Sequence, residues 1–159
     1  MAGDIRSKER SIVTLTLTGA SLTNLSAAVA NATADLDARS GGNFADDFNC
    51  TFELLVQWAT ITGIVAGTVI GELYLVPLVD GTNLPDVDLT AGSSRLPYAS
   101  YVAPFDAVKA PTANTDMRFI TAPISINPLL YRPYLLNKSG QTMTANWDLK
   151  AVGVQGQYT

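Results

Sequence analysis

The chain has 159 residues, a net charge of −4 and only 15% charged residues, where a soluble domain usually has roughly 25%. It holds no histidine and one cysteine, Cys50, which excludes Ser–His and Cys–His catalytic pairs and an intrachain disulfide framework. Its ten Lys and Arg residues form no basic stripe, so we expect no nucleic-acid partner. A surface this short of charge must be polar through Thr, Asn and Ser, or be covered by partner subunits.

The N-terminal third begins with a charged segment. Residues 1–10 carry no apolar period, which predicts an N-terminal arm followed by a single domain over residues 11–159. Alternation from Ser11 to Thr18 predicts a half-buried strand. The Ala-rich residues 26–30 leave the next stretch ambiguous, because they are compatible with a short helix capped by Asn24, whereas residues 33–39 favour a strand.

The clearest alternation of the chain runs from Asp47 to Thr60. Successive side chains of a strand point to opposite faces, so every second residue shares an environment. The apolar set of this stretch is predicted to face the core, and it consists of Cys50, Phe52, Leu54, Val56 and Trp58.

A second stretch, from Glu72 to Val79, is apolar on both faces. This pattern is typical of a strand that is covered on both sides or that closes a subunit contact. Pro77 has no N–H to donate, which predicts a position near a sheet edge or a bulge. Asp80-Gly81 ends the strand and opens a long loop over residues 80–100, and loops of this length are often functional or interfacial.

The second half repeats the strand-and-turn pattern. Strands are predicted over residues 98–105, 116–122, 130–137 and 147–154, followed by a polar tail over 155–159. With about eight strands and no convincing long helix, the chain is predicted to be an all-β protein, an antiparallel β-sandwich of the jelly-roll kind.

A transmembrane helix is the main structural rival. Between Glu53 and Glu72 lie only uncharged residues, and Gly63, Gly67 and Gly71 have the spacing of helix-packing motifs in membranes. Polar residues inside the segment, acidic flanks and a high β-branched content favour strands joined by a loop instead. We therefore expect no membrane span.

No group of residues indicates catalysis or a cofactor. The acidic pairs Asp46/Asp47, Asp86/Asp88 and Asp106/Asp116 lie in no recognisable hydrolase context, and a calcium site built on Asp80 with Asp86 and Asp88 would lack the ligand spacing of an EF-hand. We expect no enzyme, metal or cofactor. Aromatic residues offer one further alternative, a sugar-stacking platform, although core or interface positions are commoner; they are Trp58, Tyr74, Tyr98, Tyr101, Tyr131, Tyr134 and Trp147.

Several segments, taken together, resemble a group of tailed-bacteriophage virion proteins. The resemblance covers roughly the last 90 residues and includes a strand that ends in an Asn-x-(Ser/Thr)-Gly-Gln turn. Its pieces are Glu72–Asn83 followed by Asp86, Ser100-Tyr101-Val102, Arg118-Phe119 leading to Ala122-Pro123-Ile124 and Pro128, and Tyr134–Gln141.

These virion proteins are similar to capsid decoration, or cement, proteins. The resemblance implies a β-sandwich subunit that forms dimers or trimers and lies on the outer capsid surface of the virion, where it bridges major capsid proteins. The arm and the long loop are expected to make these contacts, through Arg6, Lys8, Arg10, Asp80, Asn83, Leu84, Arg95 and Tyr98. The alternative is a carbohydrate- or receptor-binding module of a phage tail or fibre.

Overall fold

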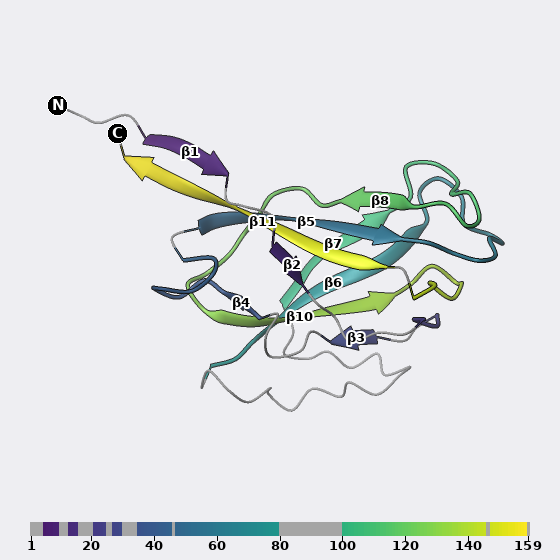
Figure 1. Cartoon of the computed structure of the whole chain (residues 1–159), viewed down its shortest axis with the longest axis horizontal. Coiled ribbons are helices and arrows are strands. Elements are labelled where there is room, and N and C mark those ends of the chain that lie inside the picture. The colour runs from purple at the N-terminus through teal and green to yellow at the C-terminus, as the bar shows by residue number, and fades with distance from the viewer. Residues whose placement is uncertain are drawn as a thin grey trace.

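Two antiparallel sheets face each other in the computed structural model (Figure 1). The structure describes residues 5–9, 13–15, 21–24, 27–29, 35–45, 47–79, 100–145 and 147–158. The first sheet contains β1 (Ile5–Glu9), β2 (Val13–Leu15), β5 (Asp47–Val56), β8 (Met117–Ile120), β9 (Ile124–Ser125) and β11 (Asp148–Tyr158). The second contains β3 (Ala27–Val29), β4 (Leu36–Asp37), β6 (Val69–Pro77), β7 (Ser100–Asp106) and β10 (Leu130–Asn137).

The strand order is that of a jelly roll. The short strands β1 and β2 share one place beside β11, β8 and β9 share one beside β5, and β3 and β4 share one beside β10. Each sheet therefore has four strand positions. Numbered along the chain, these positions run 1-8-3-6 in the first sheet and 2-7-4-5 in the second. This arrangement confirms the all-β, jelly-roll-like sandwich predicted from the sequence.

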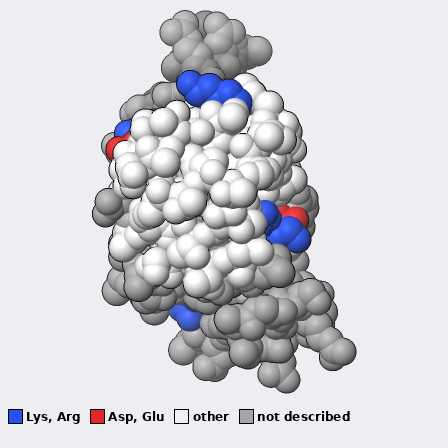
Figure 2. Space-filling model, turned by 90° about the vertical axis from the view of Figure 1, so that its right-hand side faces the viewer, with Lys and Arg blue, Asp and Glu red and all other residues white. Residues whose placement is uncertain are grey.

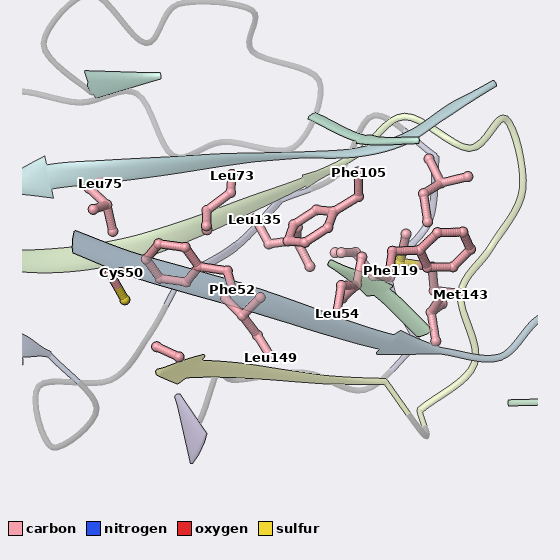
Figure 3. Packing of buried hydrophobic residues seen from close by; sticks show 14 of the residues in the cluster. Cys50, Phe52, Leu54, Leu73, Leu75, Phe105, Phe119, Leu135, Met143 and Leu149 are labelled. Atoms are coloured by element: carbon pink, nitrogen blue, oxygen red, sulfur yellow. The ribbon is translucent and has the colours of Figure 1, made fainter. Parts of the chain in front are cut away.

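The core lies between the sheets, and β5 supplies its centre. The predicted inward set of β5 and the residue just beyond it, from Cys50 to Trp58, is fully buried. Figure 3 shows this row meeting apolar residues from the opposite sheet, including Leu73 of β6, Phe105 of β7 and Leu135 of β10. The alternation of apolar and polar residues in β5 thus reflects its two faces. One face packs on the other sheet, and the other face is only partly covered.

Both faces of strand β6 are covered toward its C-terminal end, as its sequence predicted. Leu73 and Leu75 point into the core. On the opposite face Val76 is 1% exposed and Leu78, just beyond the strand, is 3% exposed, while Glu72 and Tyr74 are half-buried.

Strand β6 lies between β10 and β7, but Pro77, its last residue, lies beyond the last β6–β7 pair, Leu75 with Ser100. Among the described strands Pro77 pairs only with Tyr131 of β10, so the position near a free edge predicted for it is confirmed. The β6–β7 pairing also shifts register at two places, both away from Pro77.

The structure resolves one ambiguity and corrects one prediction. Residues 27–29, left open between helix and strand, form strand β3 on the edge of β10, because pairing with residues 134–136 outweighs the helix preference of alanine. Residues 155–158 are not a tail: they continue β11 and pair with β1. The described residues of the expected arm, 5–9, are β1 itself.

The segment proposed as a rival membrane span is the end of β5, a connection and the start of β6. Gly63 and Gly67 have φ angles of 82° and 85°, the left-handed region that glycine adopts without a steric penalty, so both serve turns. In the described part of the chain no helix is long and apolar enough to cross a membrane.

Cys50 lies in the middle of the core and is fully buried. Burial, assisted by the nearby Asp47 carboxylate, raises the pKa of the Cys50 thiol from 9.0 to about 12. Since the thiolate is the reactive form, this cysteine is an inert apolar residue.

Two measurements test this assignment. In the native protein Cys50 should not react with a thiol reagent at pH 8, whereas one thiol should react after unfolding. The folded state holds the thiol proton to a higher pH than the unfolded chain, so its contribution to stability is complete below pH 9 and is lost as the pH rises toward 12. Denaturant unfolding should therefore show Cys50→Ala losing less stability than the wild type over this range, by at most about 1.4 kcal/mol per pH unit. Native labelling at the rate of a free thiol would show that the core is not closed around Cys50.

Candidate functional site

One end of the sandwich is built from four connections between strands. We call it the loop end, and it comprises residues 21–24, 57–68, 107–116 and 138–145. In Figure 1 it is the right-hand end of the molecule, opposite the chain termini. Its connections come from distant parts of the chain, so their relative positions depend on contacts among the loops themselves.

The side chain of Asn137, at the end of β10, holds this end together. It is fully buried, and both its donors and its acceptor are used. Its Nδ2 donates to the carbonyl oxygens of Leu22 and Gln141, each at 2.8 Å. Its Oδ1 accepts from the backbone N–H of Ser139 at 2.9 Å and from the Ser139 hydroxyl at 2.7 Å. A buried amide with all its bonding positions satisfied fixes its neighbours closely, because any displacement leaves a polar group unpaired.

The hydroxyl of Ser139 carries the network to the next connection. It accepts a hydrogen bond from Trp58 Nε1 at 3.2 Å, and Trp58 packs edge-on against Phe119 with ring centroids 6.2 Å apart. The backbone carbonyl of Trp58 in turn accepts from Asn114 N–H at 2.8 Å. The loops at 57–68 and 107–116 are thereby tied to the same turn.

Two further bonds complete the network. The Gly140 N–H donates to Asn24 Oδ1 at 2.9 Å, and Gln141 Nε2 donates to the Thr62 carbonyl at 3.0 Å. The Asn-x-Ser-Gly-Gln turn that carries part of the family resemblance is therefore the structural centre of the loop end. It also explains why Asn137, although it fits a glycosylation sequon, is not accessible in the folded chain.

The outer surface of the loop end carries little charge. Val65 and Val108 are 60% and 90% exposed. Their loops lie side by side, because the Gly67 N–H donates to the Ala107 carbonyl and the Ala107 N–H donates to the Thr68 carbonyl. Most of the surrounding exposed residues are Ala, Thr and Gly. Figure 2 shows this end as a broad uncharged field with Lys, Arg, Asp and Glu only toward its edges. Protein interfaces are depleted of charge at their centres, so this surface is suited to contact another protein.

One sequence pattern indicates this surface, although above it was considered only as a possible membrane span. The uncharged run between Glu53 and Glu72 supplies the loop at 57–68. In a sandwich, such a run predicts one uncharged connection. It predicts an uncharged surface only where the neighbouring loops carry few charges as well.

Two of the predicted interface residues are described, and both lie away from the loop end. Arg6 and Lys8 are in β1, where they pair with Gln157 and Gln155. The remaining predicted interface residues are outside the described residues: Arg10, Asp80, Asn83, Leu84, Arg95 and Tyr98. The structure therefore brings none of the described candidates to the loop end.

The alternatives based on chemistry find little support among the described residues. Trp58, Tyr131 and Tyr134 are buried, so they cannot stack on a sugar, and the alternative of a sugar-stacking platform is excluded for these three residues. Asp47 is buried, Asp106 and Asp116 are exposed, and Asp116 accepts a hydrogen bond from Gln57 at 3.0 Å. No described group of three or more His, Cys, Asp or Glu residues is arranged to hold a metal ion.

No protein-family model, curated protein or solved structure matches the chain.

The role of Asn137 predicts a large effect of its removal. Asn137→Ala would leave the Ser139 N–H without its partner, which typically costs about 1–3 kcal/mol. It would also remove one of the two hydrogen bonds to each of the carbonyl oxygens of Leu22 and Gln141, which keep the Met143 N–H and the Ser139 hydroxyl. We expect denaturant unfolding to show a loss of about 2 kcal/mol or more. Asn127→Ala, which removes an exposed amide from another turn, is the control and should change stability by less than about 0.5 kcal/mol. Equal effects of the two substitutions would contradict the role assigned to the network.

Proposed function

We propose that this chain is a structural, non-enzymatic virion protein that decorates the outer capsid surface of a tailed phage and cements it by bridging neighbouring major capsid proteins. The observation that carries the proposal is the loop end: a rigid, nearly uncharged surface on a jelly-roll domain. Its attachment surface is the loop end around Val65 and Val108.

The fold and the composition support this function. Jelly rolls are a frequent architecture of virus shells, although lectins and enzymes also use them, so the fold alone does not decide. The low charge of the whole chain suits a subunit whose surface is partly covered in an assembly. The resemblance of its last 90 residues to decoration proteins points to the same class, and the turn at 137–141 that belongs to this resemblance builds the attachment surface.

Cementing follows from mass action. A subunit that binds the assembled shell and not its separated parts stabilises the shell, and this stabilisation grows as more of its binding sites are filled. Each single contact can be weak, because many copies bind to one shell. The partners are the major capsid protein and further copies of the chain. Because the exposed residues of the loop end include only three charges, Lys109, Asp116 and Lys138, binding should depend little on salt, unlike binding to nucleic acid.

Substitutions at the loop end test the attachment surface. Val65→Asp and Val108→Asp each place a charge that would lose its water on docking, so we expect affinity for decoration-free capsids of the source phage to fall about tenfold or more. Ile120→Asp is the matched control, since Ile120 is an equally bulky apolar residue, 66% exposed on β8, away from the loop end. Co-sedimentation with capsids measures the occupancy. If both loop-end variants bind like the wild type, the loop end is not the attachment surface.

The location of the protein tests the function itself. Gold-labelled antibody against the chain should mark the heads of intact virions. Label confined to the tail or its fibres would overturn the decoration proposal and favour the receptor-binding alternative.

A further inference from the structure

The two ends of the chain form a narrow ribbon. We call β1 together with residues 154–158 of β11 the terminal ribbon. Its strands are antiparallel, with Ile5 opposite Tyr158, Ser7 opposite Gly156 and Glu9 opposite Val154. Figure 1 shows the ribbon running out from the sandwich at the end opposite the loop end.

The ribbon has open backbone edges. Strand β5 pairs with β11 only as far as Asp47 opposite Gln155. From Gly156 to Tyr158, β11 therefore has β1 on one side and none of the described strands on the other. The outer edge of β1 is likewise unpaired among the described strands. A two-stranded ribbon is marginally stable in water, and an open edge accepts a strand from another chain through its N–H and C=O groups.

Charge distinguishes the two edges as sites for a second copy. When two copies of a strand pair antiparallel about a two-fold axis, the residue on the axis lies opposite the same residue of the second copy. The residue before it then lies opposite the residue after it in the second copy. On the β1 edge, an axis at Ser7 places Arg6 opposite Lys8, and an axis at Arg6 or Lys8 places that cation opposite itself. Like charges directly opposite destabilise a strand pair, so the β1 edge is unsuited to self-pairing.

The β11 edge has no such conflict. The segment from Gly156 to Tyr158 is uncharged, and an axis at Gln157 pairs Gly156 with Tyr158 of the second copy. An axis at Gly156 is ruled out, because it would place Gln157 and Tyr158 of the second copy opposite Gln155 and Val154, where β5 already pairs. An axis at Tyr158 would pair no other described residue. Among the described residues, the axis at Gln157 therefore gives the longest pairing that is compatible with both the charges and the existing sheet.

We propose that a second copy of this chain pairs with the free edge of β11, with Gln157 on the two-fold axis. The order β1-β11-β11-β1 then joins the first sheets of both copies into one continuous sheet. The overlap is three residues on each chain, so the association is weak and depends on concentration. This inference does not rest on the proposed function, since it concerns the free protein and requires no capsid.

Charge substitutions at the axis give the first test. Gln157→Lys and Gln157→Glu each place like charges opposite each other across the axis, and sedimentation velocity at low salt should show self-association weakened about threefold or more in either variant. A mixture of the two variants should regain or exceed wild-type association, because Lys then faces Glu. Thr14→Lys and Thr14→Glu, at an exposed position of β2, are the controls and should leave association unchanged. A monomeric wild type at high concentration, or a mixture no tighter than either variant alone, would refute the pairing.

A disulfide gives the second test. In Gln157→Cys the two introduced thiols lie across the axis, so mild oxidation should link two copies. Arg6→Cys places a thiol opposite residue 157 in the same chain but on the other edge of the ribbon, and it should not link copies. Cys50 is buried and stays unlinked in both variants, so it need not be removed. Linking through position 6 and not through position 157 would assign the contact to β1 and overturn the proposal.

Discussion

A single buried amide determines the geometry of one end of this molecule. Asn137 takes its partners from the segment before β3 and from its own turn, and none of its bonds to Leu22, Ser139 or Gln141 can be lost without leaving a polar group unpaired in the interior. The turn that it stabilises then holds the connection at 57–68 through Trp58. The neutral outer surface is therefore shaped from within, by a polar network beneath apolar and small residues.

The sequence predicted those strands in which the residues on a given face are buried to a similar degree. The β5 alternation from Cys50 to Trp58 predicted the core correctly because burial imposes period two on a strand. The doubly apolar pattern of β6 predicted burial on both faces for the same reason. Residues 27–29 stayed ambiguous and residues 155–158 were mispredicted as a tail, because Ala, Gly and Gln carry little pattern and the partner of residues 155–158 is β1, more than 140 positions away in the sequence.

The loop end was out of reach of the sequence for a different reason. Several of its bonds join residues far apart in the chain, such as Thr62 and Gln141, 79 positions apart, and Asn24 and Gly140, 116 positions apart. The hydrophobic periodicity of a sequence gives no information about such distant pairs. Only the turn at 137–141 was recognised, as part of a family resemblance, and its physical role became clear when its partners were known.

The two proposed surfaces lie at opposite ends of the sandwich, because β11 starts beside the loop end and finishes in the terminal ribbon. A molecule arranged in this way offers one end to a shell and the other to a copy of itself.

The long sequence separations in the Asn137 network also set when the loop end is formed during biosynthesis. Contacts between residues 22–24 and 137–143 have to wait until residue 143 has left the ribosome, and non-local pairing of this kind folds slowly. The loop-end surface is thus absent from chains that have not reached this point. Under the proposed function, a subunit would dock only when its own interior is complete, which would keep unfinished chains out of the assembly.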